Sequence, residues 1–259
     1  MYRENTSDET VTSLPIRETI RLVGATDEFI HIETNTQMLA KAFGKFAEIY
    51  GISGDEAELF FSRNVHTSFG SANEAQIRAE TNLFDKALAK ASMFSGETAA
   101  CLIPNPDDEK LELIFDIEKI SEKLPIMVAS FLHVTDYASL GDEVKIQVFE
   151  SIVNSVAEHE FVHILQYLRD KEDFMARKNT SRNIGRWALS YTALGVPTAF
   201  AEPEVKAAYA AGTLALVGAA LFLNKDGVQK LEDEAYEIQF KSIRENKHIT
   251  PFNFSVEHG

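Results

Sequence analysis

Three residues that could bind a metal and move a proton lie within five positions of one another. His159 and His163 are four positions apart, and Glu160 directly follows the first histidine. On an α-helix, residues at i and i+4 lie on one face, so both imidazoles can reach a single ion. Zinc suits this HExxH pattern, because imidazole nitrogen is one of its preferred ligands and a catalytic site keeps a position open for water. We therefore predict a Zn²⁺ site with His159 and His163 as ligands.

Glu160 is expected to act as the general base of this site. Zinc lowers the pKa of a bound water towards neutrality, and an adjacent carboxylate can accept its proton during attack on a peptide carbonyl. The same carboxylate can pass the proton to the leaving amine. A purely structural zinc site needs the two histidines but has no use for Glu160, so its presence favours an enzyme. A non-catalytic zinc-binding scaffold is the alternative.

Two segments of the chain, one of which contains these three residues, resemble parts of a known family. The run HEFVHILQ, from His159 to Gln166, resembles the HExxHxxQ helix of small gluzincin-type metallopeptidases, including bacterial effector and injection-system core domains. The run EDEAY, which begins at Glu232, is similar to the ExEAD or ExxAD element of HtpX-like and CAAX-prenyl-protease-like enzymes. This resemblance implies a zincin-like core, with Glu232 as the third protein ligand. Tyr236 stands where those enzymes often carry an aspartate that orients a ligand imidazole.

The spacing around Glu232 is compatible with this implied role. On a helix, Glu232, Tyr236 and Gln239 share a face, and the small Ala235 beside them would let this helix approach another closely. Glu234 lies about 200° around the helix from Glu232, so both cannot face one metal. An acidic run is also the usual mark of a solvated helix face, and spacing alone leaves both interpretations open.

Other polar residues are weaker candidates for the site. Gln166, three positions after His163, could hydrogen-bond a ligand or the substrate, or be structural. Tyr236 and His248 are candidates for stabilising a tetrahedral oxyanion. Four further histidines are expected to be surface or core residues: His31, His66, His133 and His258. Cys101 lies in an apolar run and is expected to be a small buried hydrophobe.

The segment that carries the two histidines predicts one long, largely buried helix. Residues 142–170 contain no Gly or Pro, and their apolar positions follow helical spacing, with Asp142 at the expected N-cap. Further upstream, the runs AACLIP and LELIFD flank a turn of the sequence NPDDEK, which predicts a β-hairpin. LELIFD could be a sheet-edge strand that pairs with an extended substrate, or an ordinary core strand.

These elements suggest an α+β, predominantly helical chain divided into three regions. Residues 1–24 are polar and are expected to form a flexible tail. Residues 25–95 show helical spacing, broken near glycines 51, 54 and 70, and predict a helical N-terminal region. Residues 96–259 are expected to form the zincin-like catalytic domain, with a small β-hairpin or sheet. A final amphipathic helix carries Glu232, and a polar tail follows it.

Two apolar stretches, residues 187–201 and 207–223, predict a helical hairpin inserted over 187–223. Lysines and arginines flank it on both sides, as expected if both outer ends of a membrane hairpin were cytoplasmic. The longer stretch has about 17 apolar residues, or about 25 Å of helix, against a hydrocarbon core of about 30 Å. We therefore expect the hairpin to fold against the catalytic domain. A membrane-associated factor that uses residues 187–223 remains an alternative function.

Composition excludes several other classes of protein. The formal net charge of −15 and the lack of a long basic run argue against a nucleic-acid partner. The single cysteine forms no intramolecular disulfide and provides no CxxC pair, which is typical of a reducing compartment. The first residues are polar and acidic, without a secretory signal pattern. We therefore expect a cytoplasmic protein whose partner is a peptide or protein substrate.

Overall fold

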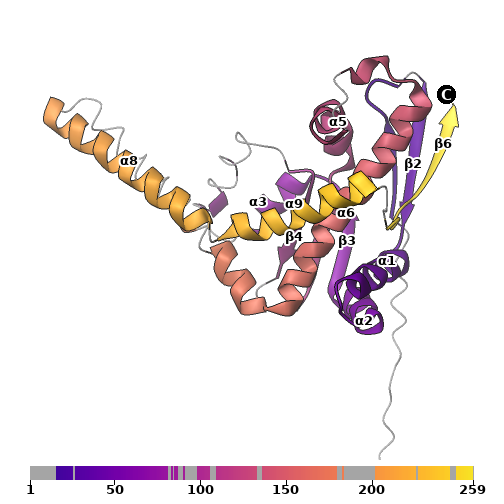
Figure 1. Ribbon diagram of the computed structural model, residues 1–259, viewed down its shortest axis with the longest axis horizontal. Coiled ribbons are helices and arrows are strands. Elements are labelled where there is room, and N and C mark those ends of the chain that lie inside the picture. Colours follow the sequence, from indigo (N-terminus) through magenta and orange to yellow (C-terminus); the bar gives the residue numbers. More distant parts are fainter. Residues whose placement is uncertain are drawn as a thin grey trace, which may run out of the picture.

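The computed structural model describes residues 16–25, 27–80, 98–105, 109–132, 136–179, 202–225, 227–245 and 249–258, with isolated positions at 83, 85, 86, 90 and 183. Helices outnumber strands in this part of the chain, and the expected mixed, predominantly helical class is confirmed (Figure 1). The helices are α1 (Thr36–Ile49), α2 (Gly54–Asn64), α3 (Ala72–Ala79), α5 (Ile117–Leu132), α6 (Asp142–Arg169), α8 (Pro203–Lys225) and α9 (Val228–Glu245). The strands are β1 (Ile16–Arg21), β2 (Glu28–Thr34), β3 (Val65–Phe69), β4 (Ala100–Pro104), β5 (Leu111–Phe115) and β6 (Asn253–His258).

Helix α6 runs through the middle of the molecule and carries both motif histidines. Every residue from Ile152 to Tyr167 is buried, because α1, α5, α9 and β4 all pack against this helix. The predicted long, buried helix is therefore confirmed. Its N-cap is Gly141, and Asp142 lies in the first turn, where its negative charge faces the positive end of the helix dipole. The predicted cap was wrong by one residue.

Phe161 anchors α6 on the side opposite the two histidines. Its ring packs edge-on against Phe43 of α1 and Phe61 of α2, with centroid distances of 5.4 and 5.6 Å. Phe161 lies about 200° around the helix from His159. With the aromatic cluster holding one face, both imidazoles point away from α1 and α2.

One three-stranded sheet is built from the two ends of the chain. Strand β2 lies between β1 and β6 and pairs antiparallel with both. The tail expected over residues 1–24 is therefore wrong from residue 16 onwards, and the polar tail expected at the C-terminus is strand β6. Ile30 and Ile32 on β2 and Ile20 on β1 are buried. These alternating residues supply enough apolar surface to order segments whose composition is otherwise polar.

A second three-stranded sheet lies beside α6. Its order is β3-β5-β4, with β3 parallel and β4 antiparallel to β5. The predicted hairpin is confirmed as β4 and β5. LELIF is the central strand, so the idea that it forms the sheet edge was wrong, and β4 lies at an edge of the described sheet instead. Strands β2 and β3 also correct the purely helical assignment of residues 25–95, although α1, α2 and α3 are present there.

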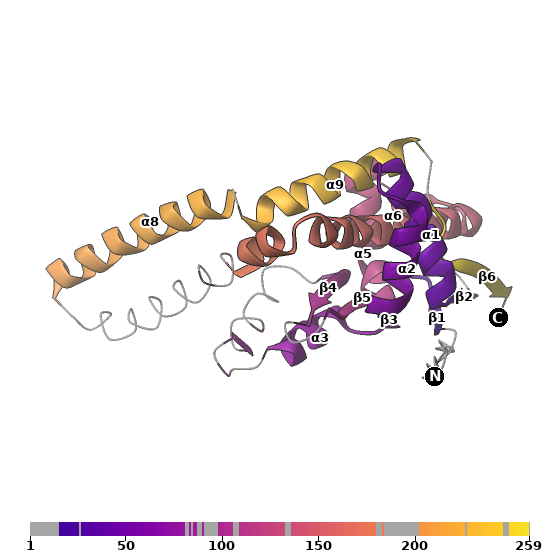
Figure 2. The same ribbon diagram turned by 90° about the horizontal axis from the view of Figure 1, so that it is seen from below.

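Helix α9 crosses α6 and packs against it (Figures 1 and 2). Ala235 of α9 is fully buried, and its small side chain allows close packing. Beyond α9, the backbone N–H of Ile249 donates to the Glu158 carboxylate of α6 at 2.8 Å. This bond holds the returning chain against the residue that precedes His159.

Helix α8 extends away from the rest of the molecule (Figures 1 and 2). None of its described side chains is buried, and Val205 and Leu214 are exposed. The expectation that this arm folds against the catalytic domain was therefore wrong for residues 207–223, where the predicted helix itself is present. The first expected arm, 187–201, lies outside the described residues. None of the described helices combines the length and apolar character needed to cross a membrane.

Candidate metal centre

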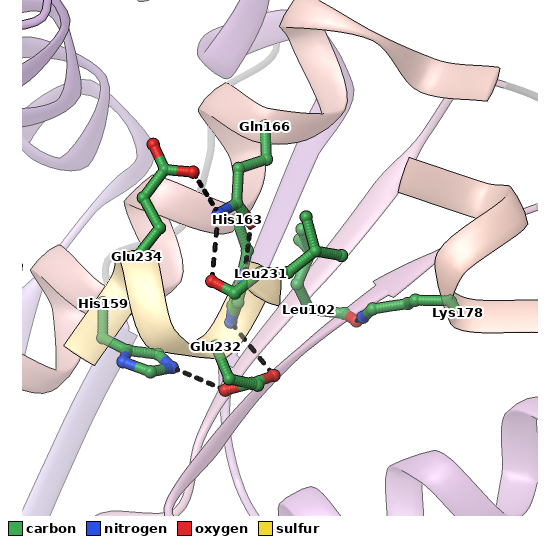
Figure 3. Close-up of polar contacts among 8 residues, drawn as sticks. All are labelled: Leu102, His159, His163, Gln166, Lys178, Leu231, Glu232 and Glu234. Carbon is green, nitrogen blue, oxygen red and sulfur yellow. Dashed lines mark hydrogen bonds and ion pairs between the residues drawn. The ribbon is translucent and has the colours of Figure 1, made fainter. Parts of the chain in front are cut away.

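Helices α6 and α9 bring His159, His163 and Glu232 together (Figure 3). One potential ligand atom from each lies within 4.8 Å of the other two. Glu232 Oε2 is 3.3 Å from His159 Nε2, and Glu232 Oε1 is 3.4 Å from His163 Nε2. Both histidines are buried, whereas the Glu232 side chain is about one-third exposed at 34%. The arrangement leaves one side of the group accessible.

These separations suit a tetrahedral zinc ion. With metal–ligand bonds of about 2.0 to 2.1 Å, two ligand atoms in a tetrahedral shell are about 3.3 to 3.4 Å apart. Each Glu232 oxygen has this spacing from one imidazole nitrogen, Oε2 from His159 Nε2 and Oε1 from His163 Nε2, which is longer than the usual N–H···O hydrogen bond of about 2.9 Å. Two imidazoles and one carboxylate also match the His₂Glu donor set of catalytic zinc sites. The residues present therefore fit the ion.

The charges of the group support one another. Burial raises the pKa of Glu232, but its contacts with His159 and His163 outweigh this effect and hold the pKa below its ordinary range. Burial lowers the pKa of His163, and the carboxylates of Glu232 and Glu160 more than reverse this, so the net pKa is raised. A carboxylate held ionised between two imidazoles is prepared to receive a cation.

Gln166 determines which nitrogen of His163 faces the metal position. Its Nε2 donates to the Leu231 carbonyl and to Glu234 Oε2, both at 3.0 Å. Since both of those partners can only accept, the amide oxygen of Gln166 lies 2.9 Å from His163 Nδ1 and accepts its proton. A proton on Nδ1 leaves the Nε2 lone pair free for a metal. Gln166 therefore orients one imidazole and also links α6 to α9 beside Glu232.

His159 has a different environment. Its Nδ1 is buried and makes no hydrogen bond to any residue that the structure describes. Tyr236 packs against this imidazole, with ring centroids 4.6 Å apart. Tyrosine thus supports His159 by ring contact, at the position where the resembled enzymes often carry an aspartate. Burial and the Glu232 carboxylate raise the pKa of Tyr236, so its hydroxyl keeps its proton and can donate a hydrogen bond.

The three residues open onto a pocket of about 540 Å³. Glu160 lines it, and one of its carboxylate oxygens is buried without a hydrogen bond to any described residue. The opposite wall includes β4 residues Ala100, Cys101 and Leu102. Burial and the carboxylate of Glu160 raise the pKa of Cys101 to about 12, so this buried residue is a thiol and not a thiolate.

The remaining residues predicted from the sequence fall into those that lie at the site and those that do not. Tyr236 and Gln166 lie at the site, while Glu234 is bonded to Gln166 and to Arg169 and lies away from the two imidazoles. His133 and His248 lie outside the described residues. The other three histidines are remote from the pocket. His31 contacts Thr19 and Glu257, His258 contacts Glu28, and His66 is exposed on β3.

Lys178 is a pocket residue that sequence reasoning did not select. It belongs to the helical stretch 171–179 and lines the same pocket as His159 and Glu160. Its Nζ donates to the Leu102 carbonyl of β4 at 3.2 Å (Figure 3). Lys178 lies fifteen residues after His163 and belongs to no motif. Only the three-dimensional structure could therefore identify it as a pocket residue.

Comparison of the chain with family models, with curated proteins and with solved structures found no match in any of the three.

Proposed function

We propose that this protein is a zinc-dependent metallopeptidase of the gluzincin type. The observation that carries the proposal is the convergence of His159, His163 and Glu232 from two helices, with potential ligand atoms within 4.8 Å of one another. A structural zinc site would be closed by a fourth protein ligand. Here the group borders a pocket, and Glu160 faces that pocket without joining the ligand set. The combination favours catalysis over a scaffold role.

Glu160 performs the proton transfers in this proposal. When bound, zinc supplies a Lewis acid that acidifies a water and polarises the scissile carbonyl. The Glu160 carboxylate, which lines the pocket, accepts the proton of the attacking water and then delivers it to the leaving amine. The Tyr236 hydroxyl, which keeps its proton, is suited to donate a hydrogen bond to the developing oxyanion.

Strand β4 offers a surface on which an extended peptide can lie. Among the described strands it pairs only with β5, and Ala100, Cys101 and Leu102 line the pocket. A peptide paired with this edge would run past the metal position with its backbone fixed by main-chain hydrogen bonds. Such pairing depends little on side chains, so specificity would come from the pocket walls.

The proposal is tested by metal analysis of the purified protein together with cleavage of casein or a peptide library. We expect about one equivalent of zinc. Glu160→Gln should retain the zinc and lose hydrolysis, because Glu160 acts on the water and not on the metal. Glu158→Gln is the matched control, since this neighbouring acid bonds to Ile249 N and does not line the pocket. A Glu160→Gln variant that cleaves at the native rate would rule out the mechanism.

Zinc binding without hydrolysis of any peptide would instead favour the non-catalytic scaffold. A second observation fits a role in association: α8 presents exposed apolar residues such as Val205 and Leu214 on an arm that extends from the molecule. This arm could contact a membrane surface or a protein partner whether or not the site is catalytic. Vesicle co-sedimentation of the full chain, compared with a Leu214→Glu variant, separates this role from peptidase activity.

A further inference from the structure

Lys178 places a cation in the wall of the candidate active site. It lies on the helical stretch that follows α6, one turn beyond the buried Phe174. Two contacts determine its position: Nζ donates to the Leu102 carbonyl at 3.2 Å, and the ammonium lies 5.0 Å from the centre of the Phe174 ring. A lysine whose ammonium is already held by two contacts loses little further entropy on binding a ligand.

Within the described residues, this ammonium has no carboxylate at ion-pair distance. The carbonyl of Leu102 takes one of its three N–H donors, which leaves the others available to the pocket. Burial lowers the pKa of Lys178, and the carboxylates of Glu160 and Glu232 partly offset this effect without direct contact. Both have other tasks in the proposed mechanism, as the base and as a metal ligand. A ligand carboxylate beside Nζ would therefore stabilise the charged form of Lys178.

The balance of charge in the pocket differs from that of the whole chain. The protein carries a formal net charge of −15, yet two lysines, Lys123 and Lys178, line this pocket together with Glu160 and Glu232. A divalent metal ion would make the lining net positive. An anionic ligand group in the pocket would meet a favourable potential, although the rest of the surface repels it.

The contact of Lys178 with β4 specifies where such a group would lie. A peptide extended along the β4 edge would pass close to Lys178, because Lys178 Nζ is bonded to the Leu102 carbonyl of that strand. A substrate carboxylate at this point would accept the remaining N–H donors of Lys178. The carboxylate could be an acidic side chain or the C-terminal end of the peptide.

We propose that Lys178 makes the site selective for substrates with a carboxylate close to the scissile bond. This inference rests on the proposed peptidase function and defines its substrate class. Lys178 is a specificity residue in this view, and it contacts the substrate and not the metal. Its partner is the carboxylate, whichever of the two sources supplies it.

Three short peptides with a hydroxamate group at the N-terminal end test the proposal by binding to zinc-loaded protein in a calorimeter, without a requirement for turnover. The first has a glutamine side chain and an amidated end, the second has glutamate in place of glutamine, and the third keeps glutamine but has a free C-terminal carboxylate. We expect one of the two anionic probes to bind about tenfold more tightly than the neutral one, as for a charged hydrogen bond in a partly buried site. The probe that gains identifies the source of the carboxylate.

Variants locate the effect. Lys178→Gln should remove the tenfold preference while the neutral probe still binds, and Lys178→Arg should keep part of it. Lys171→Gln is the matched control, because Lys171 lies on the same helical stretch but is exposed and contacts the Tyr167 ring. Equal binding of all three probes to native protein would overturn the inference while leaving the metal site intact. Protein that holds no zinc and binds no hydroxamate would instead overturn the proposed function and the inference with it.

Discussion

Replacing Gln166 with alanine should weaken zinc binding by about 10- to 100-fold, the usual effect of losing a group that orients a ligand histidine. Gln166 is buried and its amide oxygen accepts from His163 Nδ1 at 2.9 Å, which keeps the Nε2 lone pair directed at the metal position. Without the amide, the imidazole can rotate or place its proton on Nε2. Either change must be reversed before the metal binds.

The same substitution should also lower the free energy of unfolding of the metal-free protein by about 2 kcal/mol, or about 1 kcal/mol for each buried hydrogen bond lost. The two bonds are those to His163 and to the Leu231 carbonyl. The third bond, to Glu234, adds little because that carboxylate is substantially exposed. Urea unfolding in the presence of a chelator measures this term, and competition with a chromophoric chelator measures zinc affinity.

Gln239→Ala is the control that separates the two effects. Gln239 is also a buried amide between α9 and α6, but its Nε2 donates to Ser155 Oγ and no ligand imidazole is involved. It should lose about 1 kcal/mol of stability and keep native zinc affinity. If Gln166→Ala behaved in the same way, with only a loss of stability, the argument that Gln166 orients His163 would be refuted.

Three further predictions concern the metal ligands and the helix that carries them. His159→Ala, His163→Ala and Glu232→Gln should each lose most of the bound zinc in metal analysis, and full metal content in any one would remove that residue from the ligand set. Zinc affinity should fall as the pH drops through the raised pKa of His163, because protons compete with the metal. Contact with Glu232 sets this competition above the ordinary value of 6.5, and chelator competition between about pH 5 and 8 would detect it. Phe161→Ala should destabilise the fold by about 3 to 5 kcal/mol in urea, and a loss below about 1 kcal/mol would show that the aromatic cluster does not anchor α6.

Local periodicity explains why α6 and the β4–β5 hairpin could be predicted. Both are continuous segments whose apolar spacing and turn residues act over a few positions. The position of Glu232 relative to the histidines followed from a resembled motif, and the helical period only limited which acid could face the same way. The two segments could be paired although they are far apart in the sequence, because each contains a motif that resembles part of the same site.

The features that could not be predicted depend on partners far away in sequence. Strand β2 is ordered by pairing with β6 at the other end of the chain, and neither segment has a strong signal alone. The role of Gln166 requires Leu231 as a partner, and Lys178 is defined by Leu102. The predicted packing of helix α8 was wrong because its apolar composition suggests burial. Composition does not reveal which neighbouring element would bury the helix.

The division of the candidate ligands between α6 and α9 has a consequence for folding. An ion held by His163 and Glu232 would act as a crosslink between segments that are far apart in the sequence, closing a loop of about 70 residues. By loop-closure entropy alone, such a link would disfavour the unfolded chain by about 4 kcal/mol, as a disulfide of the same span would. A chain with one cysteine has no covalent means to make this link. The availability of zinc would then determine how strongly α9 is held against α6.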